Sequence, residues 1–468
     1  MISLLFAAAL AAPKEVRAAR SALTPFVEDP QLERASVGVV VHDPSTGQDL
    51  YSYNADILLA PASTAKLTTA AAALDVLGPD WRFVTRIHAQ GTLTKGVLKG
   101  DLAILGSGDP SLGVADPQAA VELWASQLKA QGITSITGDI LANDRVFSWR
   151  PLGDGWTWDD GLWRYGAPIT GLNLGHNTTT LTITGASKDG SPVKIDAGAL
   201  KDCISLDNQA TTGSASLAID RPPFDPQVRL WGSLPRGETR TLTVSIVDPP
   251  LCAATLLKKV LIANGISVEG KVRRTDSTEG TELLRVESAP LSELLKETLK
   301  TSDNLYAEAI ARSIDPEPIK SYAGASIKIA QTLAKAGITT DEYQQVDGSG
   351  LSRRDRMTAW SMVKLLDWSS QQTWGSLLQD MLPISGVDGT LAKRLAGTSA
   401  QGRLLAKTGT INGVSNLAGW LNTPNDRSLL IVMFVDGALA PAGEIRALQD
   451  QAILRLVESA PKPKKRRK

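Results

Sequence analysis

The chain has 468 residues, of which 43% are hydrophobic and 21% are charged, so it is long enough for two or three domains with their own cores. Its 49 lysine and arginine residues balance its 49 aspartate and glutamate residues, which excludes a broad basic surface for nucleic acid. The three histidines, His42, His88 and His176, lie far apart without a carboxylate at ligand spacing, and with only two cysteines the composition predicts no metal site.

The first twelve residues form an apolar run that is rich in small side chains near its end. They resemble a secretory signal with cleavage near Ala11 or Ala12, although the first cation is Lys14 and the usual positive n-region is missing. We therefore expect an exported protein, periplasmic or associated with the cell envelope. No other run approaches 18 apolar residues, so the mature chain is expected to be soluble.

The stretch from Ser63 to Leu77 is rich in Ala and Leu and is followed by Gly78, which predicts a helix with a glycine stop. Residues three apart share a helix face, so Lys66 can place its amine beside the Ser63 hydroxyl. The same S-x-x-K spacing recurs at residues 191–194, but there it lies in a turn with a proline and no helix fixes it.

Residues 91–288 differ from their flanks, because they contain many Gly, Thr and Val residues in short alternating runs such as 178–184 and 241–247. This pattern predicts a mostly β insertion, with one helix at 251–265 followed by a strand. The flanking segments, 13–90 plus 289–461, would then form one discontinuous domain.

The two cysteines, Cys203 and Cys252, both lie in the insertion, 49 positions apart. An oxidising compartment would allow a disulfide between them. The sequence leaves open whether they are bonded.

Amphipathic runs at 291–301 and 305–312 predict two helices, with the S-D-N motif of Ser302 and Asn304 on the turn between them. Further on, runs at 403–410, 415–420 and 428–435 predict adjoining antiparallel strands.

The K-T-G motif, Lys407 to Gly409, lies in the first of these strands. We expect glycine at position 409 because a strand that lets a substrate backbone approach closely has no room for a side chain there. The chain closes with a tail, 462–468, that carries six cations. Two interpretations of the tail stay open, a solvated tail and a weak contact with an anionic surface.

Each motif alone is weak, but S-x-x-K, S-D-N and K-T-G in this order form the signature of penicillin-binding proteins and class A β-lactamases. More than two hundred residues separate Ser63 from Ser302, whereas a class A β-lactamase has only a short helical stretch there. The chain resembles the class C low-molecular-mass penicillin-binding proteins, the D-alanyl-D-alanine carboxypeptidase/endopeptidases of the S13 peptidase family. Further segments carry this resemblance, namely 106–110, 155–160, 247–250 and 347–353, the last with the sequence D-G-S-G-L-S-R.

The resemblance implies an α/β (α+β) fold, with a transpeptidase-like domain of an antiparallel sheet flanked by helices. Large, mostly β accessory domains, two nested subdomains within 91–288, would interrupt it. It implies a serine D-Ala-D-Ala carboxypeptidase, a D,D-endopeptidase or both, acting without a cofactor on peptidoglycan stem peptides and inhibited by β-lactam antibiotics.

A mechanism follows from the motif residues. Ser63 would attack the peptide carbonyl and form an acyl-enzyme that water hydrolyses. Lys66 would be the base, although a free lysine with a pKa of about 10.4 is neutral only about once in 2,500 at pH 7. Lys407 can be the neighbouring cation that lowers this pKa. Ser302 would then shuttle the proton to the leaving amine, and Asn304 would hold Lys66 and the substrate amide.

The resemblance also assigns the substrate contacts. The oxyanion hole would be the backbone N–H groups of Ser63 and Thr410, and substrate would lie along the strand edge of Thr408, Gly409 and Thr410.

Arg353 and Asp144 would bind the free carboxylate and ammonium of a meso-diaminopimelate side chain, and Asn412 would border that pocket. In the alternative interpretation, Arg353 pairs with Asp355 and Asp144 caps a turn.

Two other functions remain open. A β-lactamase or esterase on the same scaffold would need a group that activates the deacylating water, and no class A type carboxylate motif is visible between Ser63 and Ser302. A non-catalytic wall-binding protein would not be labelled covalently by a penicillin.

Overall fold

The computed structural model describes residues 13–460, so the expected signal segment and the basic tail lie outside the described residues. Within the described range the chain forms two compact units. The first contains residues 13–80, 291–303 and 322–460, and the second contains residues 81–290 and 304–321.

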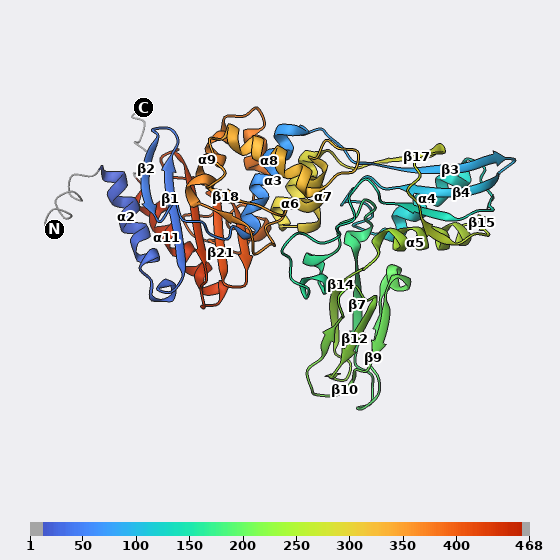
Figure 1. Ribbon diagram of the computed structural model, residues 1–468. Coiled ribbons are helices and arrows are strands. Elements are labelled where there is room, and N and C mark those ends of the chain that lie inside the picture. Colours follow the sequence, from blue (N-terminus) through green and yellow to red (C-terminus); the bar gives the residue numbers. More distant parts are fainter. Residues whose placement is uncertain (1–12, 461–468) are drawn as a thin grey trace, which may run out of the picture. The chain divides into compact units, whose positions relative to one another are not determined.

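A five-stranded antiparallel sheet is the centre of the first unit, with the strand order β2-β1-β22-β21-β20 (Figure 1). Its strands are β1 (Ser36–Asp43), β2 (Gln48–Tyr53), β20 (Leu404–Ile411), β21 (Val414–Asn422) and β22 (Ser428–Asp436). The three adjoining strands expected from the sequence are therefore confirmed. β21 and β22 are buried along almost their whole length, because helices cover both faces of the sheet.

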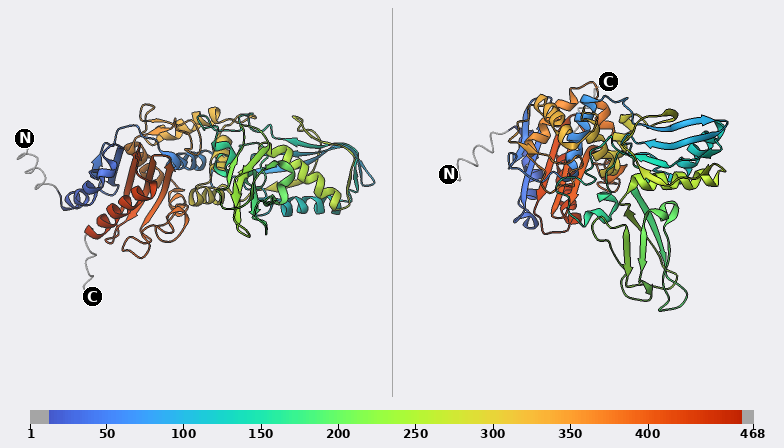
Figure 2. Two further views of the ribbon diagram at one scale, coloured as in Figure 1. Left: turned by 90° about the horizontal axis from the view of Figure 1, so that it is seen from below. Right: turned by 45° about the vertical axis from the view of Figure 1, so that its right-hand side comes forward.

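Helices α2 (Lys14–Val27) and α11 (Ala442–Ser459) cover one face, where Phe26 and Ile453 join a core with the sheet (Figure 2). Helix α9 (Ala359–Ser370) packs on β1 and β22, and α3 (Ala65–Val76) follows the short helix η2 (Ala62–Thr64), which contacts β20 and β21. The remaining elements of this unit are η1 (Pro30–Leu32), α6 (Leu291–Thr301), α8 (Tyr322–Lys335), β18 (Tyr343–Gln344), β19 (Arg356–Met357), α10 (Gly375–Asp380) and η7 (Gly389–Leu391).

The second unit contains a seven-stranded mixed sheet with helices α4 (Pro117–Ala130) and α5 (Pro249–Ala263). Trp124 of α4 and Leu257 of α5 belong to its hydrophobic core. The sheet is formed by β3 (Val84–Thr94), β4 (Val97–Leu105), β5 (Ser135–Ile136), β6 (Ile140–Asn143), β15 (Ser267–Val268), β16 (Val272–Arg274) and β17 (Thr281–Glu287). The helix expected from residue 251, with a strand after it, is thus present as α5 and β15.

A second, separate core of this unit lies between short strands and includes Leu181, Val228 and Val244. The strands β14-β7-β8 and β11-β12-β9 form two small sheets. The elements here are η3 (Asp160–Leu162), η4 (Arg164–Gly166), η5 (Gly175–Asn177), β7 (Thr178–Thr184), β8 (Lys194–Asp196), η6 (Gly198–Cys203), β9 (Ser205–Asn208), β10 (Thr211–Thr212), β11 (Ala218–Asp220), β12 (Gln227–Trp231), β13 (Ser233–Leu234) and β14 (Thr239–Ser245).

The boundaries of the units differ from those expected from the sequence. A boundary after residue 90 would cut β3, which pairs with β4 from Arg86 to Thr94, so the second unit begins at Trp81 instead. Helix α7 (Asn304–Ser313) also belongs to the second unit, where Arg312 donates to the carbonyls of Arg150 and Ile169.

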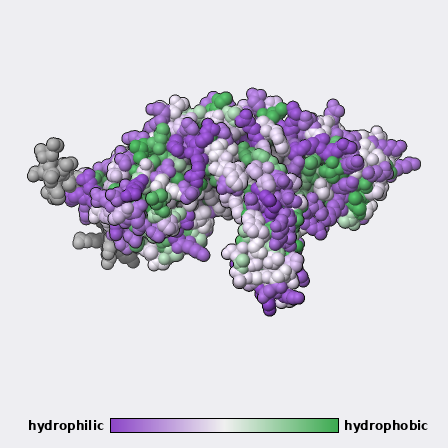
Figure 3. Space-filling model, turned by 60° about the horizontal axis from the view of Figure 1, so that its bottom comes forward, coloured by the Kyte–Doolittle hydropathy of each residue, from purple (hydrophilic) through white to green (hydrophobic). Residues whose placement is uncertain are grey.

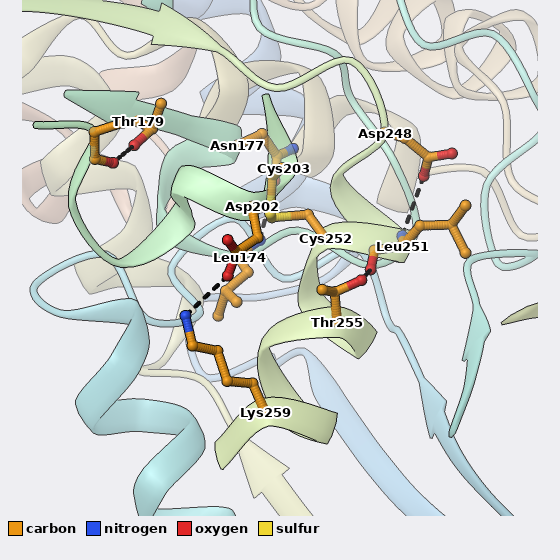
Figure 4. Close-up of a disulfide and its surroundings, with 11 residues drawn as sticks. Leu174, Asn177, Thr179, Asp202, Cys203, Asp248, Leu251, Cys252, Thr255 and Lys259 are labelled. Atoms are coloured by element: carbon orange, nitrogen blue, oxygen red, sulfur yellow. Dashed lines mark hydrogen bonds and ion pairs between the residues drawn. A yellow bond between two sulfur atoms is a disulfide. The ribbon is translucent and has the colours of Figure 1, made fainter. Parts of the chain in front are cut away.

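A disulfide joins Cys203 at the end of η6 to Cys252 in the first turn of α5 (Figure 4). Beside it, Lys259 Nζ lies 2.8 Å from a carboxylate oxygen of Asp202. The structure therefore decides the bonding state that the sequence left open.

The face seen in Figure 3 is mainly polar, with apolar residues in several separate patches. Among the described residues, no helix has both the length and the apolar character needed to cross a membrane. The described residues also contain no group of three or more His, Cys, Asp or Glu side chains suited to a metal ion.

Candidate active site

Ser63 lies in η2, directly before α3, and is half-buried. Lys66, one turn later, is fully buried, and its Nζ lies 2.9 Å from the Ser63 Oγ. The expected contact between amine and hydroxyl is confirmed. The sequence predicted a helix that begins at Ser63, whereas α3 begins at Ala65 and Ser63 lies in the short helix before it. The turn contains a strained residue, Ala62, at φ 46°.

A second partner of Lys66 comes from the D-G-S-G-L-S-R segment. Lys66 Nζ donates to the Ser349 carbonyl at 2.7 Å. The buried carboxylate of Asp347 shapes this loop by accepting from the backbone N–H groups of Gly350 and Ser352. The segment thus supplies a backbone acceptor for the lysine, a role that the sequence did not reveal.

Ser302 and Lys407 form the other half of the site. Lys407 is fully buried, and its Nζ donates to Ser302 Oγ at 2.8 Å and to the Thr408 carbonyl at 2.7 Å. Ser302 has φ 64°, a conformation that non-glycine residues rarely adopt outside functional or turn positions.

The pKa of Lys407 is well below its ordinary value, first because burial removes water from the ammonium and second because Lys66 is a nearby positive charge. Repulsion between two ammonium groups is mutual, so the pair as a whole gives up a proton more readily than an isolated lysine. This electrostatic coupling connects the two halves of the site.

The structure gives a reason for glycine at position 409 that the sequence did not indicate. A Cβ at this position would lie 2.7 Å from the Pro61 carbonyl oxygen and 3.2 Å from the Ser63 nitrogen. The close neighbour is the protein's own turn before the nucleophile, and the close approach of a substrate backbone stays a prediction. On either side of Gly409, Thr408 Oγ1 donates to Thr390 and Thr410 Oγ1 accepts from Arg446.

Other predicted site residues have partners that the sequence did not foresee. Asn304 is the first residue of α7, and its Nδ2 donates to the Tyr165 carbonyl within the second unit. Arg353 is exposed and donates to the Asn412 carbonyl at 3.3 Å, so these two residues are in contact.

Asp144, in the second unit, accepts two hydrogen bonds of 2.7 Å from Arg274, whose guanidinium also lies 4.5 Å from the centre of the Trp149 ring. Arg274 also pairs with Asp248 at 2.8 Å, so Asp144 shares this guanidinium with a second carboxylate. The sequence did not suggest Arg274 as a partner.

Sequence reasoning also missed Asn416 on β21. Its amide contacts the carbonyls of Ala60 and Pro61, just before the nucleophile, and it is 1% exposed. The sequence signal that could have identified Asn416 is its place as a polar residue within an apolar strand. Buried polar groups need hydrogen-bond partners, so such a residue is expected to make specific contacts.

Residues 19–456 match the D-Ala-D-Ala carboxypeptidase 3 (S13) family. The chain belongs to this family. A D-alanyl-D-alanine carboxypeptidase from Actinomadura sp. (strain R39) is 35% identical to this S13 chain over 463 residues, which cover 94% of the chain and 85% of the relative.

Solved S13-like structures agree with this placement. Penicillin binding protein 4 (dacB) from Haemophilus influenzae has a TM-score of 0.84 at 27% sequence identity, with 93% of this chain and 98% of that chain covered. A second structure of that protein, complexed with a β-lactam, has a TM-score of 0.78 at 26% identity over the same shares of the two chains.

Proposed function

We propose that this S13 chain is a serine D-Ala-D-Ala carboxypeptidase, a D,D-endopeptidase or both, which cleaves peptidoglycan stem peptides through an acyl-enzyme on Ser63. The observation that carries the proposal is the pair of hydroxyl–amine contacts, Lys66 with Ser63 at 2.9 Å and Lys407 with Ser302 at 2.8 Å. A serine hydroxyl needs such a base because it is a weak nucleophile at its free pKa.

In acylation, Ser63 Oγ attacks the carbonyl carbon on the amino side of the terminal D-Ala, and its proton passes to the neutral amine of Lys66. The tetrahedral intermediate then collapses as the C–N bond breaks. The ammonium of Lys66 returns this proton to the leaving amine through the hydroxyl of Ser302, which is hydrogen-bonded to Lys407. Water hydrolyses the resulting ester with the same groups in reverse order, which regenerates Ser63.

The acceptors around the lysines support this assignment. Neutral Lys66 can keep its N–H bond to the Ser349 carbonyl and direct its lone pair at the Ser63 hydroxyl. The carbonyl thereby orients the base. Lys407, held by the carbonyl of Thr408, disfavours a second charge on Lys66.

Stabilisation of the oxyanion is assigned to the backbone N–H groups of Ser63 and Thr410. The proximity of Gly409 to the Ser63 nitrogen supports this, since it brings strand β20 against the nucleophile turn. Loss of one such donor costs on the order of 2.7 to 4 kcal/mol of transition-state stabilisation.

Substrate selection is assigned to Arg353 with Asn412 beside it. Arg353 is exposed and uses a backbone carbonyl as its partner, so its guanidinium has donors left for a carboxylate. We assign it the carboxylate of a free diaminopimelate end. Asp144 and Asn304 remain predicted site residues.

The proposed setting is an exported enzyme in the periplasm or cell envelope. The Cys203–Cys252 disulfide supports it, because such bonds persist in oxidising compartments. We also propose β-lactams as inhibitors, a proposal supported by the β-lactam complex of the Haemophilus relative.

Release of D-Ala from a pentapeptide that ends in D-Ala-D-Ala, and cleavage of a cross-linked dimer, test the function directly. The wild-type protein should act on at least one of them, and Ser63→Ala should act on neither. Rapid turnover of a penicillin without peptide cleavage would favour the β-lactamase alternative. No reaction with either peptide or penicillin would favour a non-catalytic wall-binding protein.

A further inference from the structure

The two proposed oxyanion donors lie on elements that the chain does not connect locally. The Ser63 N–H belongs to the turn η2, and the Thr410 N–H belongs to the edge strand β20. Their separation must therefore be fixed by tertiary contacts between the turn and the sheet. An oxyanion hole requires both donors to lie about 2.7 to 3.1 Å from one oxygen position, so this separation controls catalysis.

One side chain spans the gap. Asn416 Nδ2 donates to the carbonyl of Ala60 at 2.7 Å and to that of Pro61 at 2.9 Å. Its Oδ1 accepts from the backbone N–H of Val435 at 2.9 Å. The buried amide thus uses both N–H groups and its oxygen, and it joins the two residues before the nucleophile turn to the central strands.

The strand register places this amide at the catalytic edge. Asn416 is paired with Gly409, and the next pair is Ser415 with Thr410. Gly409 in turn leaves no room for a Cβ against the Pro61 carbonyl. The amide of Asn416 draws that carbonyl toward the sheet, while Gly409 permits the close approach.

The Pro61 carbonyl accepts several hydrogen bonds at the turn. Besides the bond from Asn416, it accepts from Thr64 Oγ1 at 2.7 Å and from the Thr64 N–H at 3.2 Å. A second tie holds the same segment, since Ala60 N–H donates to Asp436 Oδ2 at 3.1 Å. A displacement of the Pro61 carbonyl would consequently move the nucleophile turn and the Ser63 N–H.

Only an amide satisfies this set of partners. The two carbonyls need donors and the Val435 N–H needs an acceptor, which fixes the orientation of the Asn416 side chain. An ionised aspartate has no hydrogen-bond donor, so its carboxylate oxygens would face the two carbonyl oxygens without a hydrogen bond. A leucine would leave three buried polar groups without this partner, which is costly.

We propose that Asn416 is a positioning residue that sets the separation of the two oxyanion donors, Ser63 N–H and Thr410 N–H. The inference rests on the proposed function. Replacement of Asn416 should affect the chemical step and not binding. The reason is that Asn416 positions the oxyanion donors and does not itself contact the ligand in the initial complex.

The test is the kinetics of acylation by benzylpenicillin, resolved into the dissociation constant of the initial complex and the first-order acylation constant. For Asn416→Asp and Asn416→Ala at pH 7.5, we expect the acylation constant to fall about 10- to 100-fold, less than the 10²- to 10³-fold cost of removing a donor altogether. The dissociation constant should stay within about threefold of wild type, as expected for an interaction made in the transition state.

A pH series adds a signature that a merely structural role would not give. A protonated aspartate regains one O–H donor, so the acylation constant of Asn416→Asp relative to wild type should rise as the pH falls. The relative constant of Asn416→Ala should not.

The matched control is Ser385→Ala. Ser385 is also fully buried in the first unit, where it donates to the Ala400 carbonyl and accepts from the Leu404 N–H. Its loss should lower thermal stability without a change in the acylation constant. Should the alanine variant of Asn416 fail to fold, the pH series of the aspartate variant carries the test.

Acylation constants within threefold of wild type for both Asn416 variants would overturn the inference. An equal loss in Ser385→Ala would overturn it as well, because the effect would then be general destabilisation. If the wild-type protein itself is not acylated, it is the proposed function that fails.

Discussion

Lys66 Nζ donates to the carbonyl of Ser349, a residue 283 positions further along the chain, at 2.7 Å. This bond gives the amine of the proposed base a second partner besides its local one, the Ser63 hydroxyl.

Replacement of Lys66 by Ala should remove the base and leave the nucleophile in place. Acylation by penicillin should fall by about 10²- to 10⁴-fold, the usual contribution of a positioned general base. Stopped-flow or quenched labelling measures it. Lys335→Ala is the control. This exposed lysine of α8 forms an ion pair with Asp75, which lies on α3 as Lys66 does, but Lys335 itself lies outside the site. Near wild-type acylation by Lys66→Ala would place the base elsewhere.

Lys407 should make stability depend on alkaline pH. Its pKa is depressed by burial and by Lys66, so between this lowered pKa and the unfolded value of about 10.4 the unfolded chain binds more protons than the folded one. The free energy of unfolding should therefore rise as the pH increases from the depressed pKa toward 10.4. Lys407→Met should lack this rise in denaturant titrations across the same pH range. Identical pH dependence in both proteins would show that the pKa of Lys407 is not depressed in the folded protein.

Arg353→Ala should alter specificity. Loss of a hydrogen bond to a charged group, worth about 1.5 to 3 kcal/mol, predicts a roughly 10- to 150-fold lower rate on peptides with a free diaminopimelate end. Acylation by benzylpenicillin, which lacks that group, should change little. Arg403→Ala, which removes another arginine that donates to a backbone carbonyl, is the control. Equal losses on all substrates would mean that Arg353 supports the structure of the site.

Removal of the disulfide should destabilise the second unit alone. A loop of 49 residues between Cys203 and Cys252 predicts a loss of about 4 kcal/mol from the chain-entropy relation. Denaturant unfolding of the double Cys→Ala variant, followed together with penicillin labelling, measures both effects. Labelling should persist, because Ser63, Lys66 and Lys407 lie in the first unit. An unchanged unfolding profile would contradict the prediction.

Much of the fold was predictable, because the relevant signals are local. The Ala-rich run after Ser63, the two amphipathic runs around Ser302 and the alternating strands around Lys407 gave elements within a few residues of those found. The adjacency of Ser63 and Lys66 follows from helix geometry in the same way.

The contacts that complete the site were not predictable from local pattern. The Ser349 carbonyl and the Asn416 amide act on residues hundreds of positions away, and a backbone carbonyl leaves no signature in the sequence. The start of the second compact unit at Trp81 could not be predicted from composition, because the pairing of β3 with β4 along its length is a long-range property.

The central claim, a covalent acyl-enzyme on Ser63, is tested most directly by mass spectrometry of the protein after brief exposure to benzylpenicillin. We expect the intact mass to increase by that of one penicillin molecule, with the adduct on the peptide that contains Ser63. Ser63→Ala should fold normally and gain no mass. An adduct on another residue, or one that persists in Ser63→Ala, would contradict the account.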